Sequence, residues 1–252
     1  MCYYIAKYGQ TKTLDHTKKR TKQVKKIIKK ALILTIPVML GYITVGMAFG
    51  MLLQSTGLSA STGIFMSLLI YAGSMQFIAL DLFLESSGFL QIAIVTFFVN
   101  MRHMFYGFSF IDKFKQMKTK KWYMIFALTD ETYSLLVSLE AENTKENQLL
   151  FFLIALFNQC YWVIGTVMGI FVGTRMTFDT TGIDFSMTAL FVVILVGQLK
   201  STKSYISTAI GITASLIAVM TVGANNMILP AMGIILILLT VLRKNIEGGS
   251  ES

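Results

Sequence analysis

Long apolar stretches alternate with short polar links along almost the whole chain after residue 30. They cover residues 31–54, 62–84, 88–111, 122–139, 149–172, 186–199, 204–222 and 226–242. A helix needs about 20 apolar residues to cross roughly 30 Å of hydrocarbon, and most of the stretches are about that long. The pattern therefore predicts an all-α integral membrane protein, a polytopic bundle of seven to eight helical segments.

Two of the eight stretches differ from simple crossings. Residues 62–84 are interrupted by the sequence YAGSMQF and carry Asp81, and Glu85 follows directly after them. Residues 186–199 would reach only about 21 Å as a helix, which is shorter than the hydrocarbon layer. We expect both segments to be broken or re-entrant, which leaves six full spans.

Basic residues lie beside the predicted spans. Residues 18–30 contain eight of the 22 lysines and arginines, and residues 113–121 contain five more. If both unusual segments return to the side they came from, these clusters share one side, which the positive-inside rule makes cytoplasmic, and the acidic loop 140–147 lies outside. Eight full crossings would separate the two clusters. The cytoplasmic side would also hold Arg175, Lys200, Lys203, Arg243 and Lys244.

The charge pattern divides the chain into three parts. We expect residues 1–30 to form a basic cytoplasmic extension, residues 31–242 the transmembrane domain and residues 243–252 a short cytoplasmic tail. The two basic clusters are expected to bind anionic lipid headgroups at the membrane surface.

The overall composition excludes several function classes. The chain of 252 residues is 54% hydrophobic and 14% charged, with a mean hydropathy of +0.65, more apolar than a soluble core of this length requires. The net charge of +9 comes largely from the clusters that flank spans, so it does not indicate nucleic acid binding. Cys2 and Cys160 lack ligand-like neighbours, and the sequence contains no Walker, GxSxG, HExxH or CxxC motif. We therefore expect no enzyme activity, metal site or cofactor.

Residues 46–77 and 169–199 share a weak internal similarity. Each begins with a GxxxG helix end and continues through a polar link and an apolar stretch to a glycine and a glutamine. Under the topology above the two copies run in opposite directions and would form an inverted repeat; shared glycine-rich composition is the alternative. The small residues also predict helix-packing faces, within the chain or toward another subunit. These residues are Gly46, Gly50, Gly165, Gly169 and Gly173.

Charged side chains inside the predicted spans are few. Each costs about 2.5–3.5 kcal/mol at the bilayer centre, so each needs a partner, a polar cavity or a function. The sequence FFVNMRHMFYGFSF, residues 97–110, places Arg102 and His103 in an apolar run. On a helix, Asn100 and His103 share one face, while Arg102 and Tyr106 share a neighbouring one. We interpret this polar wedge as part of an intramembrane site; an arginine that snorkels to the membrane surface is the alternative.

A second charged sequence, FALTDETYSLLV, adds Asp130 and Glu131 to the predicted span 122–139. In neighbouring hairpin arms, these carboxylates and Arg102 can offset one another's desolvation. The alternative is that both carboxylates lie at an exposed helix end.

The interrupted sequence AGSMQF supplies further polar candidates. A broken helix presents free N–H and C=O groups near the bilayer midplane, where they can bind the charged ends of a solute. The candidates are Gly73, Ser74 and Gln76, with Asp184 and Gln198 in the second half of the chain.

Taken together, these motifs resemble those of the AzlC family, the large subunits of bipartite branched-chain amino-acid exporters. The similarity covers residues 31–242 in the family's order. The matching stretches are GMAFG at 46–50, GLS at 57–59, MSLLIYAGSMQF at 66–77, VNMRHMFYG at 99–107, LTDETY at 128–133 and GIDFSMTALF at 182–191. Met75 replaces the alanine that is usual in the family's AGSAQF motif, which alters the expected shape of a pocket.

The resemblance implies a secondary transporter in the bacterial cytoplasmic membrane. It would export branched-chain and other hydrophobic amino acids together with a small AzlD-type membrane subunit. A passive small-solute channel and a non-transporting accessory subunit are the alternatives.

For such a substrate, the candidate residues take expected roles. Gly73, Ser74 and Gln76 would bind the polar ends of the amino acid, and Arg102 would hold its carboxylate or pair with an acid. Asp130 or Glu131 would pair with the ammonium group of the amino acid or carry a proton. His103 could titrate in the same relay because imidazole changes charge near neutral pH.

Overall fold

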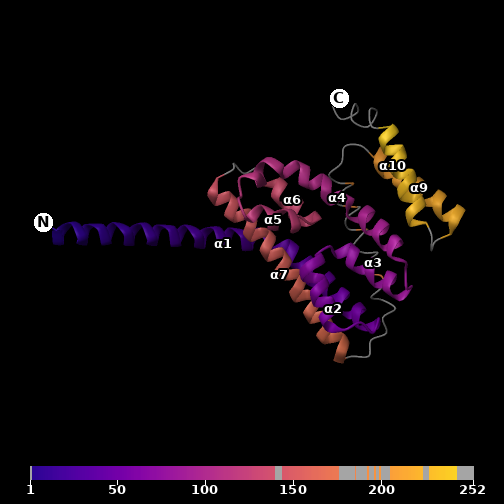
Figure 1. Ribbon diagram of the computed structural model, residues 1–252, viewed down its shortest axis with the longest axis horizontal. Coiled ribbons are helices and arrows are strands. Elements are labelled where there is room, and N and C mark those ends of the chain that lie inside the picture. Colours follow the sequence, from indigo (N-terminus) through magenta and orange to yellow (C-terminus); the bar gives the residue numbers. More distant parts are fainter. Residues whose placement is uncertain are drawn as a thin grey trace. The chain divides into compact units, whose positions relative to one another are not determined.

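The computed structural model describes residues 2–139, 144–175, 205–223 and 227–242, together with the single positions 185, 192, 196 and 199. Throughout these ranges every regular element is a helix, which confirms the predicted all-α fold (Figure 1). The elements are α1 (Cys2–Ser55), α2 (Ala60–Phe65), the π-helix η1 (Met66–Ile70), α3 (Gly73–Leu84), α4 (Phe89–Lys115), α5 (Lys120–Phe126), α6 (Asp130–Ser138), α7 (Lys145–Arg175), α9 (Ile206–Val222) and α10 (Ile228–Val241). Among the described helices, α1 over Thr21–Ser55 and α7 are long and apolar enough to cross a membrane.

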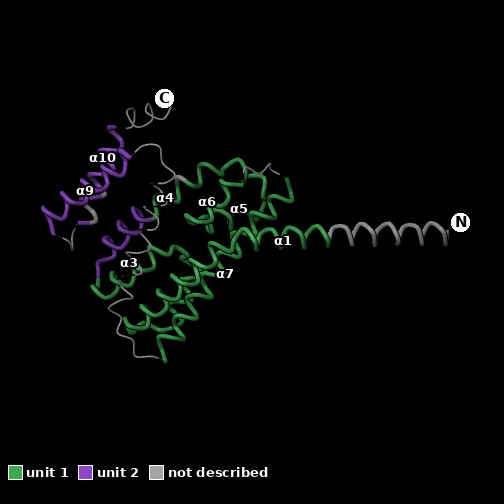
Figure 2. The backbone as a smooth tube through the Cα atoms, turned by 180° about the vertical axis from the view of Figure 1, so that it is seen from behind, with its two compact units in different colours: residues 1–86, 100–183 green, residues 87–99, 184–252 purple. Residues whose placement is uncertain are grey.

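The chain forms two compact units, coloured separately in Figure 2. The first contains Met1–Ser86 and Asn100–Ile183, and the second contains Ser87–Val99 and Asp184–Ser252. In the second unit, α9 and α10 pack against each other. The candidates Asp184 and Gln198, and most of the predicted segment 186–199, lie outside the described residues. The other candidate site residues all belong to the first unit.

Helices α1 and α7 pack against each other and run in the same direction (Figure 1). Residues near the start of α1 meet residues near the start of α7, and the pairing advances in step along both helices. In order, the pairs are Gln23 with Glu146, Thr35 with Tyr161, Gly46 with Gly165, and Gln54 with Gly173. The predicted inverted repeat requires the first helices of the copies 46–77 and 169–199 to run in opposite directions. That requirement is wrong for the described starts of the two copies, in α1 and α7, and most of the second copy lies outside the described residues.

Glycines allow the backbones of α1 and α7 to approach closely. A Cβ atom at Gly50 would lie 2.3 Å from the carbonyl oxygen of Thr166, and one at Gly169 would lie 2.1 Å from that of Met47. These distances are far below van der Waals contact, so a larger side chain would force the helices apart. All five glycines of the predicted packing faces lie at this contact, which joins two helices of one chain.

Gly50→Ala is expected to destabilise the protein, whereas Gly41→Ala in the same helix is not. The new methyl group at Gly50 overpacks the helix contact, at a cost of about 1–3 kcal/mol. A Cβ atom at Gly41 meets nothing within 4 Å, and alanine is a better helix former than glycine by about 0.8–1 kcal/mol. Thermal unfolding in detergent measures both variants. Equal melting temperatures would contradict the close approach of α1 and α7.

A broken hairpin enters the first unit from the C-terminal end of α1 and α7. It consists of α2, η1 and α3, and the chain reverses where Tyr71 adopts a left-handed backbone with φ 46°. Along the hairpin, the contacts are Gly63 with Ile170, Leu68 with Gln159, Gly73 with Trp162, and Phe77 with Phe49. The predicted interruption of residues 62–84 at YAGSMQF is confirmed, because η1 ends at Ile70 and α3 begins at Gly73.

A second broken hairpin, α5 and α6, enters from the opposite end. Its contacts, in chain order, are Lys120 with Phe152, Tyr123 with Gln159, Thr132 with Asn158, and Tyr133 with Phe110. The prediction of one full span over residues 122–139 is wrong, because α5 and α6 have 7 and 9 residues and reach only about 10–14 Å each. Thr129 starts the new helix by accepting a hydrogen bond from the N–H of Thr132, and the carboxylates in the first turn favour a helix N-terminus.

The second hairpin changes the position of α7 in the topology. Because α5 and α6 return to the end from which they came, α7 begins beside Gln23, at the basic end of α1. The described part of the acidic loop, residues 144–147, therefore lies at this end and not opposite it as predicted. Lys113 lies over the ring of Phe151 near the start of α7, so the basic cluster 113–121 shares this end, in agreement with the prediction.

Candidate functional site

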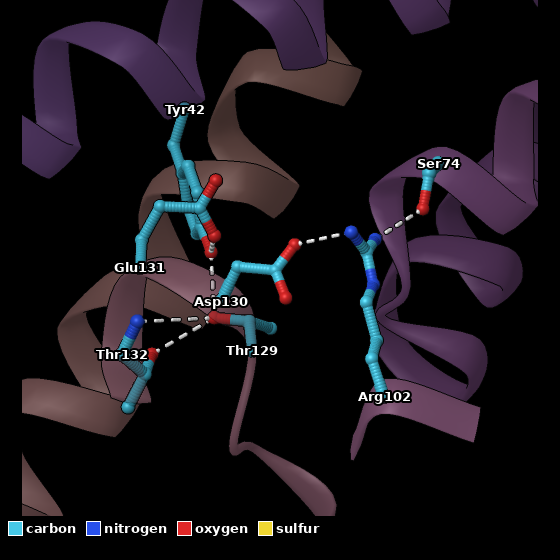
Figure 3. Close-up of polar contacts among 7 residues, drawn as sticks. All are labelled: Tyr42, Ser74, Arg102, Thr129, Asp130, Glu131 and Thr132. Atoms are coloured by element: carbon cyan, nitrogen blue, oxygen red, sulfur yellow. Dashed lines mark hydrogen bonds and ion pairs between the residues drawn. The ribbon is translucent and has the colours of Figure 1, made fainter. Parts of the chain in front are cut away.

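Arg102 joins the tips of the two hairpins. It projects from α4, and its Nη1 lies 2.8 Å from Oδ2 of Asp130, the first residue of α6. Its Nη2 donates a hydrogen bond of 2.7 Å to the Oγ of Ser74, in the first turn of α3. Figure 3 shows the guanidinium group between these two partners. The side chains of Arg102 and Asp130 are 29% and 18% exposed, so the ion pair is largely withdrawn from solvent.

The two helices that begin at this ion pair contribute their N-terminal ends. The first N–H groups of a helix have no partner within it, and the helix dipole places partial positive charge there. The starts of α3 at Gly73 and of α6 at Asp130 therefore both favour a negatively charged group near Arg102. Asp130 supplies the opposite charge at the same place.

Glu131, although adjacent to Asp130, has different partners. The hydroxyl of Tyr42 on α1 donates a hydrogen bond of 2.6 Å to Oε2 of Glu131 and lies 2.7 Å from the hydroxyl of Thr129 (Figure 3). The hydroxyl of Thr129 lies 3.0 Å from that of Thr132. A chain of hydroxyl groups thus connects Glu131 to the cap of α6.

Polar side chains of α7 hold both hairpins in place. The Nε2 of Gln159 donates to the carbonyl oxygen of Leu68 in η1 at 3.1 Å, and its Oε1 accepts from the Tyr123 hydroxyl of α5 at 2.7 Å. One residue earlier, Asn158 donates to the hydroxyl of Thr132 in α6 at 3.0 Å. Two adjacent amides in the middle of α7 therefore fix the hairpins at the level where they meet.

Gln76 fastens the two arms of the first hairpin to each other and to α7. Its Oε1 accepts a 2.9 Å hydrogen bond from the indole N–H of Trp162, and its Nε2 donates to the Oγ of Ser67 at 3.1 Å. The hydroxyl of Ser67 also lies 2.8 Å from that of Thr166. Gln76 is fully buried, and both ends of its amide are engaged within the protein.

The structure brings some of the candidate residues from the sequence into direct contact and places others around them. Ser74, Arg102 and Asp130 are in direct contact, and Glu131 follows in the same helix turn. Three other candidates surround them: Gly73 packs on the Trp162 ring, His103 lies 5.9 Å from the ring of Tyr106, and Tyr106 stacks on Tyr133 at 4.3 Å. Asn100 is partly buried two residues before Arg102 on α4.

Sequence reasoning missed several uncharged polar residues of this region. They are Tyr42, Ser67, Thr129, Thr132, Asn158, Gln159, Trp162 and Thr166. A usable signal was present in the sequence FNQCYW at 157–162, where two amides lie in the middle of a span. Uncharged polar residues inside the membrane also require partners, so the rule applied to charges would have found them.

The ion pair keeps unused bonding capacity. The buried atoms Arg102 Nε, Asp130 Oδ1 and Asn158 Oδ1 have no hydrogen-bond partner among the described residues. A buried donor of one charge and a buried acceptor of the other can together receive a solute that carries both charges. Within the described ranges there is no group of three or more histidine, cysteine or acidic residues that could hold a metal ion.

Broken helices that meet beside charged residues are typical of helical membrane proteins that bind a small solute near the bilayer midplane. The first unit has this architecture. The family model described as AzlC protein matches residues 37–176, more than half of the chain. The chain belongs to the AzlC family, as the sequence motifs predicted.

Three relatives illustrate the range of similarity. The chain is 38% identical over 237 residues to the branched-chain amino acid transport protein AzlC of Bacillus subtilis (strain 168), which covers 94% of this chain and 93% of that protein. It is 36% identical over 222 residues to an uncharacterized membrane protein of Helicobacter pylori (strain ATCC 700392 / 26695), covering 88% and 97%. It is 29% identical over 186 residues to the inner membrane protein YgaZ of Escherichia coli (strain K12), covering 69% and 74%. No solved structure matches the chain.

Proposed function

We propose that the protein is the large subunit of a secondary transporter that exports branched-chain and other hydrophobic amino acids across the bacterial cytoplasmic membrane. It is not an enzyme in this proposal, and it works with a small AzlD-type membrane subunit. The name of the Bacillus subtilis relative, which aligns over 94% of the chain, supports the substrate class. The observation that carries the proposal is the ion pair of Arg102 and Asp130, held between two hairpin tips.

An amino acid in its zwitterionic form fits the charges of this ion pair. Its carboxylate would bind Arg102 and the first N–H groups of α3 and α6, while its ammonium group would bind Asp130. Arg102 then exchanges the carboxylate of Asp130 for that of the substrate, and Asp130 exchanges the guanidinium group for the substrate's ammonium group. A solute with only one charge would leave Arg102 or Asp130 unpaired, and breaking a buried ion pair in this way costs up to about 3–5 kcal/mol. The site therefore selects zwitterions over simple ions.

The other candidates take supporting roles in the proposal. Ser74 positions the guanidinium group of Arg102, and Gln76 holds the first hairpin in shape because its amide is engaged with Ser67 and Trp162. Apolar side chains around the tips would receive the aliphatic part of the substrate. One methylene changes binding in an apolar pocket by only about 1–3 kcal/mol, so valine, leucine and isoleucine are expected to compete.

The proposed orientation has the N-terminus in the cytoplasm. The basic residues of α1 and the cluster 113–121 lie at the same end of the first unit, where both can meet anionic lipid headgroups. With this orientation α1 and α7 both run outward. The first hairpin then enters from the outer face and the second from the cytoplasmic face. Arg175 at the end of α7 lies outside in this orientation, which replaces the cytoplasmic position expected from the sequence.

Export of labelled leucine from proteoliposomes that contain this chain and the AzlD-type subunit tests the proposal. We expect efflux against a leucine gradient that an uncoupler abolishes, with valine and isoleucine as competitors. Flux that only ever follows the leucine gradient would indicate a channel instead. Photoactivatable leucine that labels only the small subunit would indicate an accessory role for this chain.

A further inference from the structure

Glu131 is an acidic residue that the substrate site described above does not use. Its neighbour Asp130 is paired with Arg102, whereas the Glu131 side chain accepts a hydrogen bond of 2.6 Å from the neutral hydroxyl of Tyr42. Among the residues that the structure describes, no lysine or arginine forms a salt bridge with Glu131. The two adjacent carboxyl groups therefore differ in kind: one is half of an ion pair, and the other is held by a hydroxyl group.

The groups that face Glu131 come from several elements and are mostly neutral. Tyr42 of α1 and the Thr129 cap of α6 lie in its hydrogen-bonded chain, and Tyr71 at the tip of the first hairpin is close to it. The charged groups nearby are Asp130 and Arg102, which already neutralise each other, and α7 contributes the neutral amide of Asn158. A carboxyl group in such surroundings readily binds a proton, because the neutral acid needs no counter-charge.

The hydroxyl chain can transmit the protonation state of Glu131 to the start of α6. When Glu131 is ionised, the single hydroxyl proton of Tyr42 points to the carboxylate, and the hydrogen bond between Tyr42 and Thr129 takes its proton from Thr129. When Glu131 carries a proton, the acid donates to the Tyr42 oxygen, and Tyr42 must turn its own proton toward Thr129. Thr129 caps α6, which begins with Asp130, so the change reaches the partner of Arg102 within one helix turn.

We propose that Glu131 binds the coupling proton of this transporter, and that Tyr42 and Thr129 relay its protonation state to the ion pair of Asp130 and Arg102. The inference rests on the proposed export function. In one cycle, a proton from the outer solution binds a carboxylate oxygen of Glu131 and is released to the cytoplasm, while one zwitterionic amino acid moves outward. Because the zwitterion has no net charge, each cycle carries one positive charge inward.

The number of protons moved per leucine tests this inference. Proteoliposomes with a trapped pH-sensitive dye and labelled leucine report both fluxes at once. We expect about one proton per leucine for the unchanged protein, and a ratio near zero for Glu131→Gln at whatever leucine flux that variant retains. Glu85→Gln, at the exposed end of α3, is the matched control and keeps the ratio of the unchanged protein. An unchanged ratio in Glu131→Gln would overturn the inference.

Infrared spectroscopy decides the same question without leucine. A proton-binding glutamate gives a carboxylic acid C=O band that appears and disappears with pH. This band should be absent from Glu131→Gln and present in Glu85→Gln, and Tyr42→Phe, which keeps the carboxyl group, should move the pH at which it titrates. If the unchanged protein moves no leucine but shows this band, the substrate assignment fails and the proton site stands. If all variants share one pH-dependent spectrum, the proton site fails.

Discussion

Arg102→Lys is expected to lower leucine transport by roughly tenfold to a hundredfold. The guanidinium group contacts Asp130 with one nitrogen and Ser74 with another, and the ammonium group of lysine is a single point that cannot reproduce this fork. Loss of one hydrogen bond to a charged group costs about 1.5–3 kcal/mol, which corresponds to the stated range. The measurement is the initial rate of leucine efflux from proteoliposomes, normalised to the amount of folded protein.

Two comparisons make this result specific to the ion pair. Arg175→Lys, at the exposed end of α7, should transport at the rate of the unchanged protein. Arg102→Ala and Asp130→Ala should each lower leucine transport strongly, because each leaves the opposite charge unpaired. The double variant should lose less transport activity than the sum of the two single losses, since it leaves neither charge behind. Full activity of Arg102→Lys would instead indicate an arginine that merely reaches toward the membrane surface.

Gln76→Leu is expected to destabilise the protein strongly while leaving the affinity for leucine unchanged. The substitution removes the partner of the Trp162 indole and of the Ser67 hydroxyl in a fully buried place. The buried Trp162 N–H left without an acceptor costs about 1–3 kcal/mol, whereas the Ser67 hydroxyl keeps its contact with Thr166. Thermal unfolding in detergent should show a clear loss of stability, and the folded fraction that remains should keep its KM for leucine.

The control for this variant is Gln91→Leu. Gln91 is exposed on α4, so the same chemical change there should leave the melting temperature almost unaltered. A raised KM for Gln76→Leu at normal stability would mean that the amide binds substrate, as the sequence had suggested. The two readouts therefore separate a residue that supports the hairpin from one that contacts the solute.

The sequence pattern was sufficient for the helical class and for the first chain break, but not for the second. Residues 66–77 contain Gly73 and a glycine-serine step, and small residues of this kind mark a possible break. The second break at Ala127–Thr129 has neither glycine nor proline, and depends instead on a threonine cap followed by two carboxylates. Read by hydropathy alone, residues 122–139 looked like one span. This single difference reversed the predicted direction of α7.

The sequence was sufficient to predict the charged residues of the candidate site, but not the uncharged residues that hold them in place. Arg102 and Asp130 were identified because charge inside a membrane is costly, and that cost applies in any fold. Which of Asp130 and Glu131 pairs with Arg102 depends on the rotation of α6, which its cap at Thr129 sets. The amides of Asn158 and Gln159 were overlooked because their importance depends on tertiary contacts with both hairpins.

The contacts of α7 also bear on the order in which the protein can be completed during synthesis. Both hairpins leave the ribosome before α7, yet the groups that bond to them, Asn158, Gln159 and Trp162, belong to α7. Until that helix is inserted, the polar atoms of Thr132 and Gln76 lack these partners inside the bilayer. The hairpins therefore cannot reach their final form as they emerge, and a nascent chain that stops before residue 162 should be a substrate for quality-control proteases.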